Sequence, residues 1–158
     1  MYGSYGVGRV AARKEQKVLG TKQEVVVLEL EDELTVTLPL TRAQEQLRPV
    51  AGEADMRRVQ KTLRADRVLS GDPWLSRRRE TLAKLTGGDP VELAEIVSDG
   101  AQRERMRRAK GNNAQLSPGE REVFVKARKL LTGEIARARG LEEAEADGWI
   151  DAQLTRTS

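Results

Sequence analysis

The chain has 158 residues, 28 of them Lys or Arg and 25 Asp or Glu, and it contains neither His nor Cys. This composition excludes imidazole acid and base catalysis, thiolate nucleophiles, disulfides and zinc sites built from imidazole or thiolate, and it leaves an enzyme only carboxylate, Lys, Tyr or hydroxyl chemistry. We expect no enzyme and no metal or cofactor, because the Asp, Glu and Lys residues that could supply such chemistry are scattered along the chain. The net charge of +3 is too small to indicate a polyanion partner by itself.

No stretch approaches the roughly 18 apolar residues of a membrane span, since the longest apolar run covers only residues 25–28. The first six residues lack the basic and then apolar pattern of a signal peptide. We therefore expect a cytoplasmic protein with no membrane contact that is a monomer when free.

Apolar and polar side chains alternate in the first third of the chain, which is typical of strands. Val26, Leu28 and Leu30 form one alternating set and residues 34–38 form another, joined by a short acidic connection. This pattern predicts an antiparallel hairpin whose second strand ends at Pro39, because proline cannot donate to a strand ladder.

Two glycine-containing turns come earlier in the chain. Residues 6–10 fit a turn that enters a strand, and residues 19–21 fit the turn that leaves the next strand. Gly6 and Gly8 lack the third glycine and the following helix of a phosphate-binding loop, so we assign them to the turn. Four short strands predict a small, strongly bent sheet or partial barrel over residues 1–50.

After residue 52 the apolar period changes to 3.6, which is typical of helices, and Met56, Val59 and Leu63 form the first stripe. Asp72-Pro73 and Asp89-Pro90 each supply an N-cap and a proline at the first helical position, so each predicts a helix start. The apolar sides are expected to hold Leu75, Leu82 and Leu85 in the first helix, which stops at Gly87-Gly88, and Leu93, Ile96 and Val97 in the second.

Ser117 and Glu120 match the Ser-x-x-Glu capping box and predict the start of a further helix, with Gly140 beyond its end. Its predicted apolar face holds Val123, Phe124, Ala127, Leu130, Leu131 and Ile135, and a last short helix holds Trp149, Ile150 and Leu154. Residues 107–115 lack apolar periodicity and predict a mobile basic loop. The expected fold class is α+β, with an all-α bundle over residues 53–158.

The positive charge is concentrated in one part of the chain. Residues 57–84 carry nine basic and three acidic side chains, whereas basic and acidic side chains balance in residues 1–50. Within this stretch Trp74 precedes three consecutive arginines, Arg77, Arg78 and Arg79, at a spacing that places Trp74 on one helix face with the first two. Guanidinium groups beside an indole suit nucleic acid, because arginine contacts phosphates while an aromatic ring wedges at an opened base step.

Structural explanations exist for each of these features. Trp74 can instead cover the helical core while the arginines form a solvated face. Trp149 is expected to pack in the core or between domains. The acidic residues Glu142, Glu143, Glu145 and Asp147 lie at helix spacing without a bent loop and are expected to form a solvated face, with no metal bound.

The ordered motifs resemble the CarD/CdnL family of bacterial transcription regulators over almost the whole chain. The resemblance is carried by residues 2–10, residues 34–39 with Leu47-Arg48-Pro49-Val50, Trp74 with its arginines, and the capping-box helix that runs from residue 116 to residue 136. It implies a Tudor-like N-terminal domain that adds its sheet edge to the RNA polymerase β subunit. It also implies a helical domain that contacts promoter DNA at the upstream edge of the melted region and stabilises the open complex.

Residue roles follow from the same resemblance. Trp74 falls at the position of the family's DNA wedge, Arg77 and Arg79 fall at or near its basic DNA-facing positions with Arg78 between them, and Arg103 and Arg121 are further candidates. Gln16 and Thr37 stand where family members often carry polymerase-contacting arginines, and Val18 and Thr35 lie beside them.

The chain also departs from the family's pattern. It begins at the family's Tyr-Pro-like turn, with Gly3 in place of the proline, so most of the usual first strand is missing from the printed sequence. Either the assigned start is too late or the β domain is incomplete. The alternative function is a protein-interaction adaptor, associated with ribosomes or repair, that uses the same strand edge without a promoter role.

Overall fold

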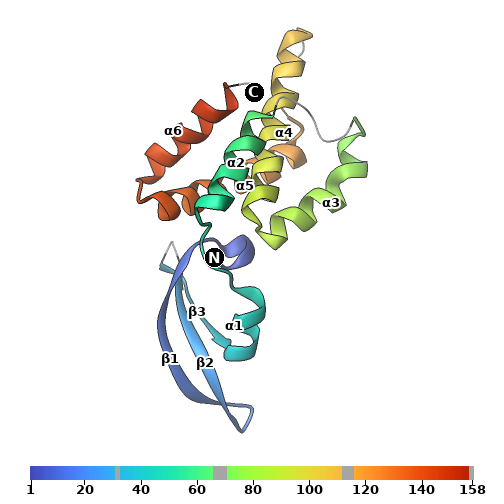
Figure 1. Ribbon diagram of the computed structural model, residues 1–158. Helices are drawn as coiled ribbons and strands as arrows, with labels where there is room; N and C mark the ends of the chain where they lie inside the picture. Colours follow the sequence, from blue (N-terminus) through green and yellow to red (C-terminus); the bar gives the residue numbers. More distant parts are fainter. Residues whose placement is uncertain (31–32, 66–70, 112–115, 157–158) are drawn as a thin grey trace.

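The computed structural model describes residues 1–30, 33–65, 71–111 and 116–156 and places a small sheet beneath a group of helices (Figure 1). The described residues form a short 3-10 helix η1 (Gly3–Tyr5), three strands and six α-helices. The predicted α+β class, a small β domain followed by a helical one, is confirmed.

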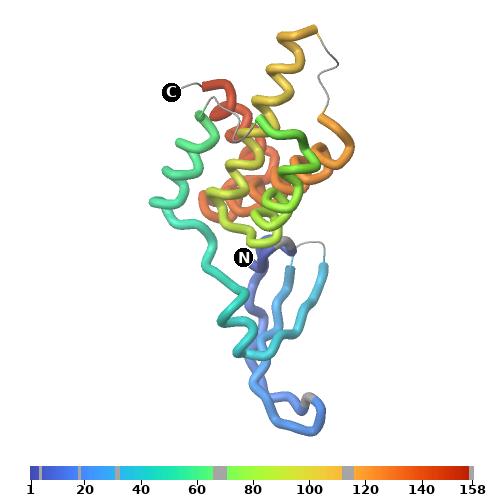
Figure 2. The backbone as a smooth tube through the Cα atoms, turned by 90° about the vertical axis from the view of Figure 1, so that its right-hand side faces the viewer, coloured from blue at the N-terminus to red at the C-terminus, as the bar shows by residue number. Residues whose placement is uncertain are grey.

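Strands β1 (Gly8–Val18) and β2 (Thr21–Leu30) form a long antiparallel hairpin that projects away from the helices (Figure 2). The predicted turn at residues 19–21 is confirmed. Both turn residues have positive φ, 52° at Leu19 and 81° at Gly20, as a type I′ two-residue hairpin turn requires.

Four short strands were expected, but the described residues contain three. One continuous strand, β1, stands where two were predicted, and its register with β2 shifts between Val10 and Ala12. Such a bulge bends and twists a strand without ending it, so one continuous strand can stand where two short strands were expected.

Strand β3 (Thr35–Pro39) pairs antiparallel with β2, which confirms the hairpin predicted from the alternation up to Leu30 and over residues 34–38. Helix α1 (Leu40–Gln46) follows directly and was not predicted, because seven residues are too few to show a clear 3.6 period. Ala43 of α1 packs on Val26, Leu28 and Leu38 and closes a small core on one face of the sheet.

The helical part comprises α2 (Glu53–Arg64), α3 (Trp74–Gly87), α4 (Pro90–Ala109), α5 (Pro118–Arg139) and α6 (Glu143–Leu154). Helix α4 packs against both α2 and α5, and α6 packs against α5 and α2. The predicted stripes form this core, whose fully buried members include Met56, Val59, Leu63, Leu93, Val97, Leu131, Ile135 and Ile150. No described helix is long and apolar enough to cross a membrane.

The starts of α3, α4 and α5 were predicted within a residue, but two of their three predicted capping interactions were wrong. Asp89 caps α4 as expected and accepts from the backbone N–H groups of Val91 and Glu92. Pro73, rather than Asp72, occupies the N-cap of α3. Ser117 occupies the N-cap of α5, but its hydroxyl donates to the Glu120 carboxylate at 2.9 Å instead of accepting from the backbone.

Two further predictions were wrong. Leu75, expected on the buried side of α3, is exposed. Residues 107–109, expected in a loop, form the end of α4, because a run of arginines continues a helix readily even without an apolar stripe. Residues 112–115 of the predicted loop lie outside the described part of the chain.

The β part and the helical part share a continuous interface. Met1 and Val7 are buried in the same core cluster as the helices. Arg48, which follows α1, donates through Nη2 to Glu134 Oε1 of α5 at 2.6 Å and to the carbonyl oxygen of Gly88 at 2.6 Å. The sheet is therefore fixed to the helices by apolar packing and by a buried ion pair.

Candidate nucleic-acid interface

Trp74 is the first residue of α3, and its ring is half buried against the helical core. Gly119 of α5 permits the close approach of the ring, because a Cβ at this position would lie 2.7 Å from Trp74 Nε1. A small cavity of about 30 Å³ lies between Trp74, Leu116 and Phe124. The indole is therefore held between the starts of α3 and α5.

Arg77 fixes the indole from its own helix. Its guanidinium carbon lies 5.5 Å from the Trp74 ring centroid. Its Nε donates to the carbonyl oxygen of Asp72 at 2.8 Å, and its Nη2 donates to Glu120 Oε2 at 3.1 Å. With only 12% of the Arg77 side chain exposed, this charge is compensated inside the protein rather than presented to solvent.

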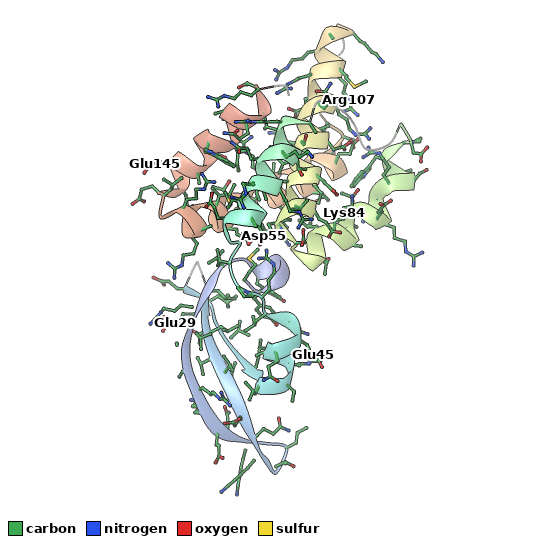
Figure 3. The ribbon with its side chains drawn as sticks, in the orientation of Figure 1. Glu29, Glu45, Asp55, Lys84, Arg107 and Glu145 are labelled. Carbon is green, nitrogen blue, oxygen red and sulfur yellow. The ribbon has the colours of Figure 1, made fainter. Side chains whose placement is uncertain are left out.

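Glu120 joins three helices at this point. It accepts from Ser117 and Arg77, and Arg107 reaches it at 3.4 Å from the far end of α4 (Figure 3). Burial alone would raise the pKa of this carboxyl, but the hydrogen bonds from Ser117 and Arg77 and the charge of Arg107 outweigh burial and hold the pKa below 4.5. Glu120 is therefore ionised at neutral pH.

Asp99 of α4 extends this group, which we call the buried ionic network: Arg77, Asp99, Arg103, Arg107 and Glu120. Asp99 Oδ2 lies 2.9 Å from Arg103 Nε and 3.7 Å from Arg77 Nη1. Arg103 is thus drawn into the protein, with 13% of its side chain exposed. Sequence reasoning missed Asp99, which belongs to no local motif. It also missed the role of Gly119 beside Trp74, although Gly119 lies within the capping-box motif, because only the tertiary fold brings α3 and α5 together here.

The remaining predicted cations face solvent. Arg78 and Arg79 are exposed on α3, and Arg121 is exposed in the first turn of α5, two residues beyond Gly119. Leu75, next to Trp74 in the chain, is also exposed, and sequence reasoning missed this exposure. The structure therefore separates the six predicted nucleic-acid residues into Trp74 with three solvent-facing arginines, and two arginines inside the buried ionic network.

The predicted polymerase-binding residues lie on opposite edges of the sheet. The strand order is β1-β2-β3, so β1 and β3 are the edge strands. Gln16 is exposed on β1, whereas Thr35 and Thr37 are exposed on β3. Val18 ends β1, but its side chain lies outside what the structure describes. No single edge of the sheet contains all four residues.

The two remaining features have structural roles. Trp149 is half buried, with the guanidinium carbon of Arg139 at 5.5 Å from its ring centroid. In the acidic group on α6, Asp147 Oδ1 accepts from Arg128 Nε at 2.8 Å. The described residues contain no group of three or more acidic, His or Cys side chains that could hold a metal ion.

Comparison with protein families matches both halves of the chain. Residues 58–151 match the CarD C-terminal domain, and residues 1–51 match the CarD-like/TRCF RID domain. The RID domain is a module that interacts with the RNA polymerase β subunit, and CarD proteins are non-enzymatic transcription factors. With more than half of its residues covered by the C-terminal match alone, and the RID match adjoining it, this chain belongs to the CarD/CdnL family of RNA polymerase-interacting transcription regulators.

Proposed function

We propose that this chain docks on the RNA polymerase β subunit through its sheet edge and contacts promoter DNA at the upstream edge of the bubble through Trp74, so that the open complex lasts longer. The observation that carries the proposal is the position of Trp74. An indole stands at the start of a helix with exposed arginines, within a helical domain fixed to a polymerase-interacting module.

A fixed indole is well suited to act as a wedge. Because its side chain is already ordered in the free protein, binding does not cost the entropy of ordering it. The contacts of Trp74 with Arg77 and Gly119 supply that order. Stacking on an opened base step contributes about 1–3 kcal/mol, which corresponds to about a 5- to 150-fold longer lifetime.

Arg78, Arg79 and Arg121 are the proposed phosphate contacts, because their side chains reach solvent on α3 and in the first turn of α5, the two helices whose starts hold Trp74. Contacts of this kind position a protein on DNA without reading base edges. The recognition is therefore of DNA shape and melting rather than of a specific sequence. We assign Arg77 and Arg103 to the support of Trp74 and α3 instead.

The β3 edge is the proposed docking edge. Charged side chains on an edge strand oppose pairing with another strand, and β1 carries Arg9, Arg13, Lys14 and Lys17. Strand β3 carries Thr35 and Thr37 instead and has no charged side chain. A strand of the polymerase β subunit can add to such an edge by β-augmentation.

Labelled single-cysteine variants test this docking, since the chain has no native Cys. We expect the unlabelled chain to co-elute with the isolated lobe of the polymerase β subunit in gel filtration. A bulky maleimide on Thr37→Cys should abolish co-elution, and the same label on Gln16→Cys should not. Elution of the unmodified chain apart from the lobe would contradict the proposed docking, and loss only with the Gln16 label would move the docking to β1.

A further inference from the structure

A second surface lies between the β part and α5, and its lining does not include Trp74. It is an open groove of about 770 Å³. We call it the interdomain groove, and it is lined by Tyr5, Gly6, Val7 and Leu34 from the β part and by Pro118, Arg121, Glu122, Val125, Lys126, Lys129, Leu130 and Gly133 from α5. Neither domain alone forms it, so its shape depends on the interface that joins them.

Several large apolar side chains are exposed together in the groove. Tyr5, Leu34 and Val125, which are 61%, 46% and 54% exposed, are among the few large apolar side chains that the described residues leave on the surface. Val7 and Leu130 lie buried beneath them. Exposed apolar side chains gathered in one concave place mark an interaction site, whereas scattered ones do not.

The apolar surface is also preformed. Tyr5 stacks on Tyr2 with ring centroids 5.0 Å apart, which limits the movement of the Tyr5 ring. Val125 and Leu130 belong to α5, whose other face is part of the buried core. A partner therefore meets side chains whose order does not have to be created on binding.

The charge along the groove is positive. Among the lining residues that the structure describes, Arg121, Lys126 and Lys129 are basic and Glu122 is acidic. Such a rim favours an acidic partner, because complementary charge speeds association and selects against like-charged partners. The lining residues of α5 extend from Pro118 to Gly133, which at the rise of an α-helix spans about 22 Å, or four turns.

We propose that the interdomain groove binds an acidic amphipathic helix of a protein partner. Its apolar side chains, repeated at i, i+3, i+4 and i+7, would pack on Tyr5, Leu34 and Val125, and its carboxylates would face the basic side chains of α5. Nucleic acid fits this surface less well, because a phosphate backbone leaves the apolar floor without a partner. The groove lining does not include Trp74, Thr35 or Thr37, although Leu34 directly precedes β3 and Arg121 is also a proposed phosphate contact.

An NMR titration of the isotope-labelled full chain tests this inference. The probe is a synthetic amphipathic peptide of about 16 residues with Leu on one helix face and Glu on the other, long enough for four turns. We expect saturable amide shifts at Tyr5, Leu34, Val125 and Leu130. Comparison probes are the same peptide with Lys in place of Glu, and a duplex DNA of similar length.

Matched variants locate the binding. Val125→Asp should weaken binding of the acidic peptide about tenfold or more, while Val10→Asp, at a similarly exposed valine on β1 (58%), should leave it unchanged. Amide spectra of both variants outside the substituted region check that they fold. A Val125→Asp variant that does not fold is replaced by Leu34→Asp.

Three results would overturn the inference. The acidic peptide could cause no saturable shift in the groove, or the basic peptide or the DNA could bind there at least as tightly. The groove amides could also shift with protein concentration when no peptide is present, which would show that a second copy of the chain occupies the groove. Failure of polymerase docking in the separate gel-filtration experiment leaves this titration unaffected.

Discussion

At the scale of single residues, Trp74 is a positioned side chain. Arg77 approaches its ring, Gly119 leaves room for its Nε1, and Glu120 fixes Arg77 in turn. A Trp that is half buried and braced in this way differs from a merely exposed aromatic, because its orientation is set before any partner binds. Substitutions around Trp74 should therefore alter its function without changing the indole itself.

Gly119→Ala should displace Trp74, because the added Cβ would lie 2.7 Å from Nε1. In a Trp149→Phe background, where Trp74 is the only fluorophore of its kind, we expect the emission maximum to shift to longer wavelength as the ring moves into water. Gly148→Ala is the control, since nothing lies within 4 Å of its Cβ position and alanine in a helix should stabilise by about 1 kcal/mol. An unchanged spectrum for Gly119→Ala would contradict the proposed bracing of the ring.

Glu120 should make stability depend on pH. Its pKa is lower in the folded state than its ordinary 4.5, so its contribution is fully present above the unfolded-state pKa and is lost as pH falls through the folded one. Chemical denaturation should show wild type more stable than Glu120→Gln by about 1–3 kcal/mol at pH 7, with the difference shrinking below about pH 4.5. A difference that stays constant from pH 7 to pH 3 would exclude this role.

At the scale of elements, the connection between α1 and α2 joins the sheet to the helices. Arg48 lies in this connection and bonds to Glu134 on α5 and to the Gly88 carbonyl at the end of α3. Glu134 is almost completely buried, with 1% of its side chain exposed, so its charge depends on Arg48 for compensation. The orientation of the sheet relative to α3 depends on this contact.

Arg48→Ala should destabilise the protein by about 3–5 kcal/mol, because it leaves the Glu134 carboxylate buried and unpaired. Arg9→Ala is the matched control. It breaks an exposed pair with Glu29 and should cost at most about 1 kcal/mol. Equal losses of unfolding free energy in the two variants would show that the Arg48 contact does not stabilise the interface.

Elements with a clear period were predictable, and contacts between elements were not. Met56, Val59 and Leu63 carry the helix period and are buried as expected, and the alternation around Leu28 identified a strand. Whether Leu75 is buried or exposed depends on which side of α3 packs against the other helices. No local sequence pattern gives that information. Likewise Arg77 belongs to a run of arginines in the sequence, and only the approach of α4 and α5 shows that it is enclosed.

At the scale of the whole molecule, the β part and the helical part form one continuous body. Met1 and Val7 of the β part enter the helical core, so the sheet and α3 are not joined by a flexible tether. For a regulator that contacts polymerase and DNA together, a fixed connection lets binding at one site position the other. In the proposed complex, the exposed arginines would determine how strongly the helical part holds DNA.

Replacing Arg78 and Arg79 with Ala should reduce the salt dependence of binding to an upstream fork-junction DNA by about two units, close to 0.9 for each lost phosphate contact. The control replaces Arg42 and Arg137, which are exposed on α1 and near the end of α5, and changes the net charge equally. We expect no change of slope in the control, as measured by fluorescence anisotropy. Equal slope changes in the two double variants would show that only the net charge matters, and would contradict specific phosphate contacts by Arg78 and Arg79.

The lifetime of the open promoter complex tests the central claim most directly. It is measured by competitor challenge with wild-type chain and with Trp74→Ala, each first shown to co-elute with polymerase. We predict that wild-type chain prolongs the lifetime, and that Trp74→Ala removes most of this effect, about 5- to 150-fold, while polymerase binding stays intact. An equally long lifetime with Trp74→Ala would contradict the proposed role of the indole at the upstream edge of the bubble.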